Sequence, residues 1–335
     1  MVGLVPTLRA FSPANARLAA GVFILALASG CASLVPQTRE LARGLPQGLP
    51  AKVELTQTPF FPQLEYQCGP AALATVLANA GVKTTPEELV PQVYLPERRG
   101  SLQVEMLAAA RRHGMISYAL APRFEDVLRE IAAGTPVIVL QNLGVFTAGW
   151  HYAVAIGYDY DRGMLVLRSG TQEREVMPFA AHEVVWMRSN YWAMVAVPPD
   201  RIPATAEEKS WLNAIAALER TGDARGARIA YKTFLERWPE NVNAHVGLAN
   251  THHTLGELKD AEKVLRDAVR RDPDSVVVLN NLAQTLSDLG RNEEALPVID
   301  RAATAGGTFA GAVQQTRETI LQRLGRERSG VERIQ

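Results

Sequence analysis

The residues of this 335-residue chain whose type and spacing bear most on chemistry are its two cysteines and six histidines. Cys68 stands in YQCGPAALATVLANAG, directly before Gly69 and Pro70, where an apolar helical pattern over 70–80 begins. Proline suits a first helical turn, since its missing N–H would have no partner there. A thiol at that position faces the positive end of the helix dipole, which lowers its pKa and favours the thiolate. Cys68 is therefore a candidate nucleophile, and an inert buried cysteine is the alternative.

A thiolate nucleophile requires a base within hydrogen-bond reach. His151 begins the strand pattern HYAVAIGY, directly after Gly149 and Trp150, so it is expected at the end of a sheet, where sites are built. The other histidines fall in helical segments. His151 is therefore the candidate base, and a polar strand-end residue without a catalytic role is the alternative.

The two patterns together resemble a known family. Cys-Gly-Pro-Ala opening an apolar helix, followed about 80 residues later by His-Tyr-Ala-Val and Gly-Tyr, resembles the C39-like branch of the papain-like cysteine peptidases. The resemblance covers roughly 58–198 and implies a helix-borne Cys68 nucleophile that faces a strand-borne His151 base. It also implies that Gln63 supplies an oxyanion-hole donor beside the backbone N–H of Cys68. Gln63 precedes Cys68 by five residues, whereas six is usual in many papain-like enzymes, so Gln67 is the alternative donor.

The third catalytic position departs from the family, which commonly places Asp followed by Pro at the end of the next strand. The turn DYDRG at 159–163 would fold two strand patterns together and bring Ser169 to this position, with Gly170 in place of Pro. A serine hydroxyl can accept from Nδ1–H of His151, but it brings no charge to hold the imidazolium. The amides Gln141 and Asn142 are alternative orienting residues.

These residues predict a cysteine peptidase that cleaves peptide bonds. One alternative is a weak or inactive peptidase-like scaffold, and another is a different acyl transfer through the same residues. No cofactor is expected and no metal-ligand constellation is visible, because HEVVW at 182–186 lacks a second histidine. The 35 basic and 35 acidic side chains balance, so nothing indicates a nucleic-acid footprint.

The elements that must position this chemistry follow from hydrophobic periodicity. Helical patterns cover 70–80, 86–93, 101–113, 124–133 and 179–187. Strand patterns cover 136–141, 151–158, 164–169, 174–177 and 192–197. Helices that precede most of the strands indicate an α+β fold.

The second half of the chain repeats with a period of 34 residues. Three sets of residues share this spacing: Gly222, Gly256 and Gly290; Ala227, Ala261 and Ala295; Pro239 and Pro273. This period is typical of tetratricopeptide repeats, which form an all-α solenoid that binds proteins. A capping helix is expected over 311–324. The candidate partner-binding groove residues are Asn243, Asn250, His253, Asn280 and Gln284.

The second cysteine indicates a membrane anchor. In RLAAGVFILALASGC the apolar run 18–29 is too short to span a bilayer, which needs about 20 residues, and it fits an export signal. The small residues before Cys31 resemble the bacterial lipobox, with Ala28 where Leu is preferred, and imply lipidation of Cys31. An ordinary signal peptide with a chance cysteine is the alternative. Ala32, rather than Asp, favours the outer membrane facing the periplasm.

The expected organisation has four segments. A lipoprotein signal peptide covers 1–30, the lipidated Cys31 and a tether cover 31–52, a C39-like peptidase domain covers 53–200, and tetratricopeptide repeats with a capping helix cover 205–325. The expected partners are a peptide or protein substrate at the peptidase domain, a protein at the repeats and a membrane at the lipid.

Overall fold

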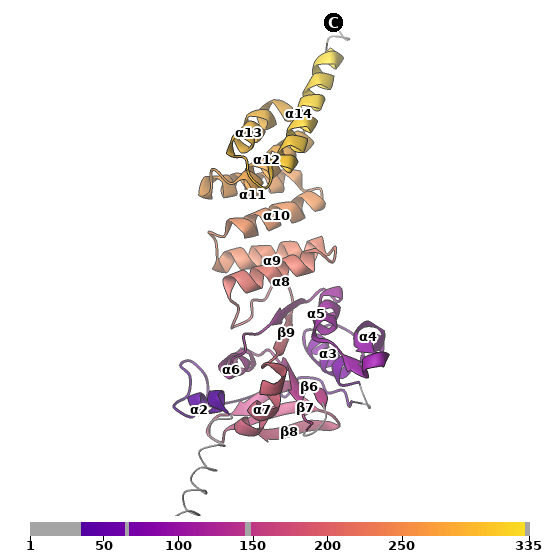
Figure 1. Ribbon diagram of the computed structural model, residues 1–335, viewed down its shortest axis with the longest axis vertical. Coiled ribbons are helices and arrows are strands. Elements are labelled where there is room, and N and C mark those ends of the chain that lie inside the picture. The colour runs from indigo at the N-terminus through magenta and orange to yellow at the C-terminus, as the bar shows by residue number, and fades with distance from the viewer. Residues whose placement is uncertain (1–34, 64–66, 145–148, 332–335) are drawn as a thin grey trace, which may run out of the picture.

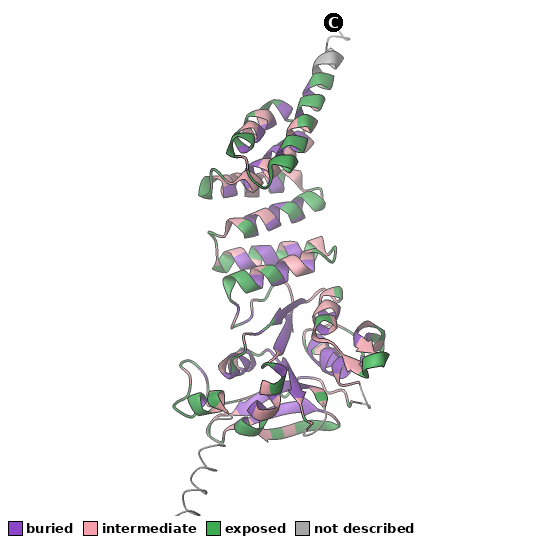
Figure 2. Ribbon diagram, viewed as in Figure 1, coloured by how far each residue is buried: buried purple, intermediate pink, exposed green. Residues whose placement is uncertain are grey.

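The computed structural model describes residues 35–63, 67–144 and 149–331. The first part of the chain forms a β-sheet with helices on both faces, and the second part is a stack of helices that extends from it (Figure 1). Buried residues line the sheet and the inner faces of the stacked helices (Figure 2). No helix in the described ranges is long and apolar enough to cross a membrane.

The sheet is antiparallel throughout, with strand order β4-β9-β5-β6-β7-β8, and β1 pairs with β6. Its strands are β1 (Lys52–Glu54), β4 (Ile116–Ala119), β5 (Val137–Asn142), β6 (Trp150–Asp159), β7 (Met164–Ser169), β8 (Gln172–Pro178) and β9 (Ala193–Val197). A separate hairpin pairs β2 (Tyr94–Leu95) with β3 (Gly100–Ser101). The predicted α+β class is confirmed. The sequence patterns missed β1, β4 and this hairpin, because two to four residues are too few to show an alternation.

Helices cover both faces of the sheet. They are α3 (Cys68–Asn79), α4 (Pro86–Val93), α5 (Gln103–Arg112), α6 (Phe124–Ala132) and α7 (Phe179–Trp186), with short 3₁₀ turns η1 (Pro96–Arg98) and η2 (Met187–Ser189). Successive residues of β6 point to opposite faces. Tyr152 and Val154 pack in the cluster around α3, whereas Ala153 and Ala155 pack in the cluster around α6. Burial on both faces explains why the β6 sequence is apolar without alternation.

The segment before the sheet is packed, not a free tether. Helix α2 (Pro36–Leu41) begins where the buried carboxylate of Glu183 accepts from the backbone N–H groups of Gln37, at 2.9 Å, and Thr38, at 2.6 Å. Farther on, the carbonyl of Pro50 accepts from the Tyr158 hydroxyl at 2.9 Å. The tether expected over 31–52 is therefore wrong for residues 36–52, because the domain supplies partners that the sequence does not reveal. Residues 1–34, with the signal and Cys31, lie outside the described residues.

The second part consists of helix pairs. They are α8 (Glu208–Glu219) with α9 (Ala224–Arg237), α10 (Val242–Thr254) with α11 (Leu258–Arg271), and α12 (Val276–Asp288) with α13 (Asn292–Ala305), followed by α14 (Ala310–Val331). Gly222, Gly256 and Gly290 join the two helices of each pair at φ values of 90°, 75° and 77°. Only glycine adopts this left-handed conformation without cost. The predicted helical repeats are confirmed, and the last helix is longer than expected.

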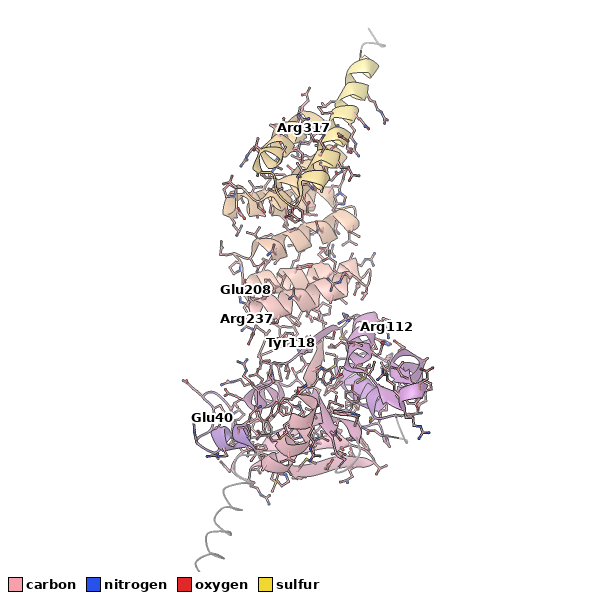
Figure 3. All side chains as sticks on the ribbon, viewed as in Figure 1. Glu40, Arg112, Tyr118, Glu208, Arg237 and Arg317 are labelled. Atoms are coloured by element: carbon pink, nitrogen blue, oxygen red, sulfur yellow. The ribbon has the colours of Figure 1, made fainter. Side chains whose placement is uncertain are left out.

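The first helix pair shares a core with the sheet. The Trp211 side chain of α8 is buried and meets the Tyr118 ring of β4 edge to face, with centroids 5.6 Å apart. Figure 3 shows Tyr118 at the junction between the sheet and the helix stack. Beside them, the buried Glu130 carboxylate accepts from the backbone N–H and the hydroxyl of Thr205, both at 2.7 Å. The segment between β9 and α8 is therefore held by Glu130 at Thr205, and the helix that follows it packs against β4 through Trp211.

Candidate active site

One cavity of about 1010 Å³ collects three of the predicted site residues: Gln63, Cys68 and His151 all line it. Cys68 is the first residue of α3, His151 is the second residue of β6, and Gln63 lies in the segment before α3. The cavity thus lies where the start of α3 meets the start of β6. Ser169 does not line it, but contacts His151 from β7.

The first turn of α3 is held by close packing around Gly69. A Cβ on Gly69 would lie 2.3 Å from Oγ and 2.6 Å from Cβ of Ser101, so only glycine fits there. The next residues of the helix, from Gly69 to Leu77, are all buried. The Cys-Gly-Pro sequence therefore allows β3 to approach the helix start and places Cys68 at the wall of the cavity.

The protonation state of Cys68 differs from the expectation. Burial raises the pKa of the Cys68 thiol, and hydrogen bonds with the backbone of Tyr152, Gly69 and Cys68 itself lower it by less. The expected net lowering of this pKa is therefore wrong, because the net shift is upward. Desolvation is the largest influence because the thiol is packed in the same cluster as the buried Tyr152.

His151 is oriented by Ser169. The register pairs Val154 with Arg168, so Ser169 lies on the same face of the sheet as Ala153 and His151. Nε2 of His151 lies 3.0 Å from Oγ of Ser169. The sequence predicted this proximity but assigned the contact to Nδ1, which is wrong. In the described residues neither ring nitrogen of His151 forms a hydrogen bond with Cys68, and the two side chains share only the lining of the cavity.

A carboxylate that the sequence did not single out also acts on His151. Burial lowers the pKa of the His151 imidazole, and the negative charge of Glu175 opposes this shift. Glu175 lies on β8 opposite Leu167, one strand beyond Ser169. Only the pairing of β7 with β8 places this charge near the site, so a single sequence carries no signal for it.

The two alternative orienting amides are engaged elsewhere. Nε2 of Gln141 lies 3.0 Å from Nδ1 of the buried His182. Oδ1 of Asn142 accepts from the backbone N–H groups of Gly144, at 3.1 Å, and Gly149, at 2.9 Å. Both amides therefore stabilise the fold around β5, and Ser169 is the side chain that contacts His151.

Gln63 is fixed to the sheet through its backbone. Its N–H donates to the carbonyl of Gly170 at 3.0 Å, and its side-chain Nε2 donates to the carbonyl of Tyr152 at 3.3 Å. Upstream, the buried Arg168 guanidinium donates to the carbonyl of Thr58 at 2.9 Å. These contacts hold the Gln63 amide beside Tyr152, the residue that follows His151.

The alternative donor, Gln67, has another position. It is the N-cap residue of α3, and it is not among the described residues that line the cavity. Gln63 is therefore better placed than Gln67 to reach a group bound beside Cys68.

Arginines that the sequence did not single out complete the cavity. Arg98, Arg99 and Arg188 line it, together with the half-exposed indole of Trp150. They come from η1, from the turn before β3 and from η2. Sequence reasoning could not find them, because their proximity to Cys68 depends on how the β2–β3 hairpin and η2 pack.

The predicted groove residues lie on the first helices of two repeats, α10 and α12. Asn250 accepts from Nδ2 of Asn281 at 3.0 Å, and His253 Nε2 lies 2.9 Å from Asp288. The other three follow the same helices: Asn243 is exposed, Asn280 contacts Asn281, and Gln284 donates to Asp288. Apart from Asn243, these side chains belong to a polar network that links the two repeats.

One group in the described residues has the composition of a metal site. Ligand atoms of His252, Glu257 and Asp260 lie within 4.8 Å of one another. The Glu257 carboxylate already pairs with Arg228 and accepts from His252 Nδ1, so this group is an ion-pair network.

Comparisons with known proteins agree with this architecture. Residues 55–194 match the family described as Peptidase_C39 like, and residues 212–276 and 256–310 match two tetratricopeptide repeat families. The chain therefore contains a region similar to the C39-like peptidases, followed by tetratricopeptide repeats. No curated protein matches it.

The solved structures to which this chain is similar include the following three. A protein described as a C39-like peptidase from Bacillus anthracis shares 18% identity, with 44% of this chain and 97% of that chain covered and a TM-score of 0.38. The Sgt2 TPR domain from Aspergillus fumigatus shares 18% identity, with 38% and 85% covered and a TM-score of 0.35. The TPR2B domain of yeast Sti1, in its pHsp70 complex, shares 20% identity, with 35% and 97% covered and a TM-score of 0.33.

Proposed function

We propose that this protein is a lipid-anchored cysteine peptidase whose repeats hold a protein substrate or partner. The observation that carries the proposal is one cavity lined by Cys68 at a helix start, by His151 at a strand start and by the Gln63 amide. Ser169 is within hydrogen-bond distance of His151. A nucleophile, a base, an orienting group and an oxyanion donor are the parts that acyl transfer requires.

The proposed reaction begins from the tautomer of His151 that carries its proton on Nε2. When Nε2–H of His151 donates to Ser169 Oγ, Nδ1 carries the lone pair and takes the thiol proton of Cys68. The thiolate then attacks the carbonyl carbon of the substrate. The oxyanion receives hydrogen bonds from the Cys68 N–H, which lies in the first turn of α3 and has no partner within the helix, and from Nε2 of Gln63. Gln63 can turn to it because its 3.3 Å bond to the Tyr152 carbonyl is long.

Collapse of this intermediate cleaves the C–N bond. His151 returns the proton to the leaving amine, and the acyl group remains on Cys68 as a thioester. A water molecule, deprotonated by His151, then attacks the thioester and releases the acid together with the free thiol. The bonds formed and broken in these steps need no cofactor.

A second candidate is a weak or inactive peptidase-like scaffold that acts through its repeats. Two observations favour it: Ser169 brings no charge to His151, and within the described residues Cys68 and His151 form no hydrogen bond. In addition, burial raises the pKa of the Cys68 thiol, which favours its protonated form. Active-site hydrogen bonds often tighten only when substrate binds, so the free geometry is compatible with either candidate.

Labelling with a thiol-reactive peptide electrophile separates the two candidates. We expect Cys68 to be labelled, His151→Ala to slow labelling by about 100-fold, and Cys68→Ala to abolish both labelling and peptide cleavage. Thermal unfolding of both variants shows whether the fold is retained. Cleavage by Cys68→Ala at the wild-type rate, or labelling that is independent of His151, would refute the peptidase proposal and leave the scaffold.

The proposed location rests on the apolar run 18–29 and on Cys31, which follows it. A lipid on Cys31 would hold the protein on the periplasmic face of the outer membrane without a spanning helix. Helix α2 packs against α6 and α7 only a few residues later, so the peptidase domain would lie close to the membrane surface.

A further inference from the structure

The charge around the cavity is one-sided. Arg98, Arg99 and Arg188 line it, and the described lining residues include no Asp or Glu. Arg98 and Arg188 are exposed, and in the described part of the chain neither forms an ion pair. The positive end of α3 points to the same space. The whole chain has a net charge of zero, whereas the described lining of this cavity carries three positive side chains and no carboxylate.

The segments that carry these arginines have a defined conformation. Arg188 donates to the carbonyls of Asn142, at 3.1 Å, and Gly144, at 2.8 Å, which fixes its guanidinium but leaves its charge unneutralised. Arg99 and Asn190 have positive φ values of 46° and 55°. Non-glycine residues rarely adopt this conformation, and such strain concentrates where a binding site needs it. Both residues line the cavity.

We propose that the cavity selects peptides that carry a carboxylate close to the bond attacked by Cys68, with Arg98 and Arg188 as the recognising groups. This inference rests on the proposed peptidase function for the attack itself. The carboxylate is either an Asp or Glu side chain within the peptide or the C-terminal carboxylate. A guanidinium suits both, since its two parallel N–H groups match the two oxygens of a carboxylate. Trp150 adds an exposed apolar surface for neighbouring side chains.

The direct test measures binding without chemistry. Fluorescein-labelled peptides that differ only by Glu or Gln, and by a free or amidated C-terminus, are titrated against the full-length Cys68→Ala protein by fluorescence anisotropy. We expect the Glu peptide, the free-acid peptide or both to bind about three- to tenfold more tightly, because arginine–carboxylate pairs at exposed positions have modest strength. The preference should shrink as salt rises, because salt screens exposed charges. A difference between the Glu and Gln peptides identifies a side-chain carboxylate, and a difference between the free and amidated peptides identifies the C-terminal carboxylate.

Variants assign the preference to the cavity. Arg98→Gln and Arg188→Gln should each reduce the ratio, whereas Arg98→Lys keeps the charge and should retain most of it. Arg162→Gln is the matched control, because Arg162 is exposed in the turn between β6 and β7 and does not line the cavity. Its ratio should stay at the wild-type value.

Two results would overturn the inference: equal binding of acidic and amide peptides, or a full preference in the Arg98→Gln, Arg188→Gln double variant. Labelling of Cys68 by electrophilic versions of the same peptides is measured separately. Charge preference without His151-dependent labelling contradicts the proposed function but supports the inference. His151-dependent labelling without charge preference supports the proposed function but contradicts the inference.

Discussion

At the scale of single residues, the site is held in a neutral state. Burial raises the pKa of the Cys68 thiol and lowers the pKa of the His151 imidazole, so both shifts favour thiol and neutral imidazole over thiolate and imidazolium. Neutral imidazole is the form that accepts a proton. The proposed reaction thus begins with proton transfer to His151 rather than with a preformed ion pair.

The first prediction concerns the pH dependence of Cys68 alkylation. The thiolate reacts, so the wild-type rate with iodoacetamide should rise through the raised pKa of Cys68, on the alkaline side of a free cysteine. Ser169→Asp places a carboxylate beside Nε2 of His151, which stabilises imidazolium and through it the thiolate. The profile should move to lower pH by about one unit. Stopped-flow or mass-spectrometric alkylation rates measure it.

Two further variants provide the controls for this profile. Ser169→Ala should remain on the alkaline side, because it adds no charge. Glu175→Gln removes the charge that opposes the lowered pKa of His151, so that pKa should fall further and labelling at about pH 6.5 should slow. Superimposable profiles for wild type, Ser169→Ala and Ser169→Asp would exclude Ser169 from the site.

At the scale of elements, the site depends on close backbone approach. Helix α3 and strand β3 meet where Gly69 faces Ser101, and the Tyr152 hydroxyl donates to the Ser101 carbonyl at 3.1 Å. The same hairpin carries Arg98 and Arg99 to the cavity. The packing at Gly69 therefore positions the nucleophile and the cavity rim together.

The second prediction tests this contact by stability. Gly69→Ala forces its methyl group against Ser101 and should lower the free energy of unfolding by about 1–3 kcal/mol. Ser101→Gly removes both crowded atoms, so the double variant should recover much of the loss. Urea unfolding of the four proteins measures the coupling. Gly311→Ala is the control, because nothing lies within 4 Å of a Cβ there. Additive losses at Gly69 and Ser101 would contradict the steric explanation.

At the scale of the whole molecule, the peptidase-like domain, the first helix pair and α10 share one hydrophobic cluster. It runs from Val139 of β5 through Trp211 of α8 to Leu248 of α10. A shared core fixes the direction in which the repeat stack leaves the sheet. In the proposed function, a protein held by the repeats therefore has a defined position relative to the cavity.

The third prediction is that Trp211→Ala destabilises both parts together. Removing this buried indole should cost about 3–5 kcal/mol. Because the core is shared, tryptophan fluorescence and far-ultraviolet circular dichroism should report the same lowered urea midpoint. Ile229→Ala, at a side chain that is 43% exposed on α9, should change the midpoint little. A loss confined to one of the two signals would show that the parts unfold independently.

The fourth prediction concerns the anchor. Cys31→Ser should move the protein from the membrane fraction to the soluble fraction, because a hydroxyl is not the lipidated thiol. Mass spectrometry of wild-type protein should show a lipid on an N-terminal Cys31. Cys68→Ala should remain with the membranes. A Cys31→Ser protein that still fractionates with membranes, together with an unlipidated wild type, contradicts the lipobox interpretation.

Local patterns were sufficient for much of this protein. The 34-residue spacing of Gly222, Gly256 and Gly290 predicts the repeats, because each repeat uses the same left-handed turn. Cys68 and His151 could be singled out as candidates because each stands at the start of a clearly apolar element. The register of a short hairpin was enough to bring Ser169 to His151.

Only the tertiary structure decided the rest. The direction of the Cys68 pKa shift depends on how much of the thiol the sheet and helix bury, and burial is not a property of neighbouring residues in the sequence. Glu175 and Arg188 reach the site through strand pairing and through packing of η2, which bring together residues far apart in the chain. The docking of α2 depends on Glu183, about 145 residues away. Charge and desolvation act through space, so a one-dimensional pattern does not carry them.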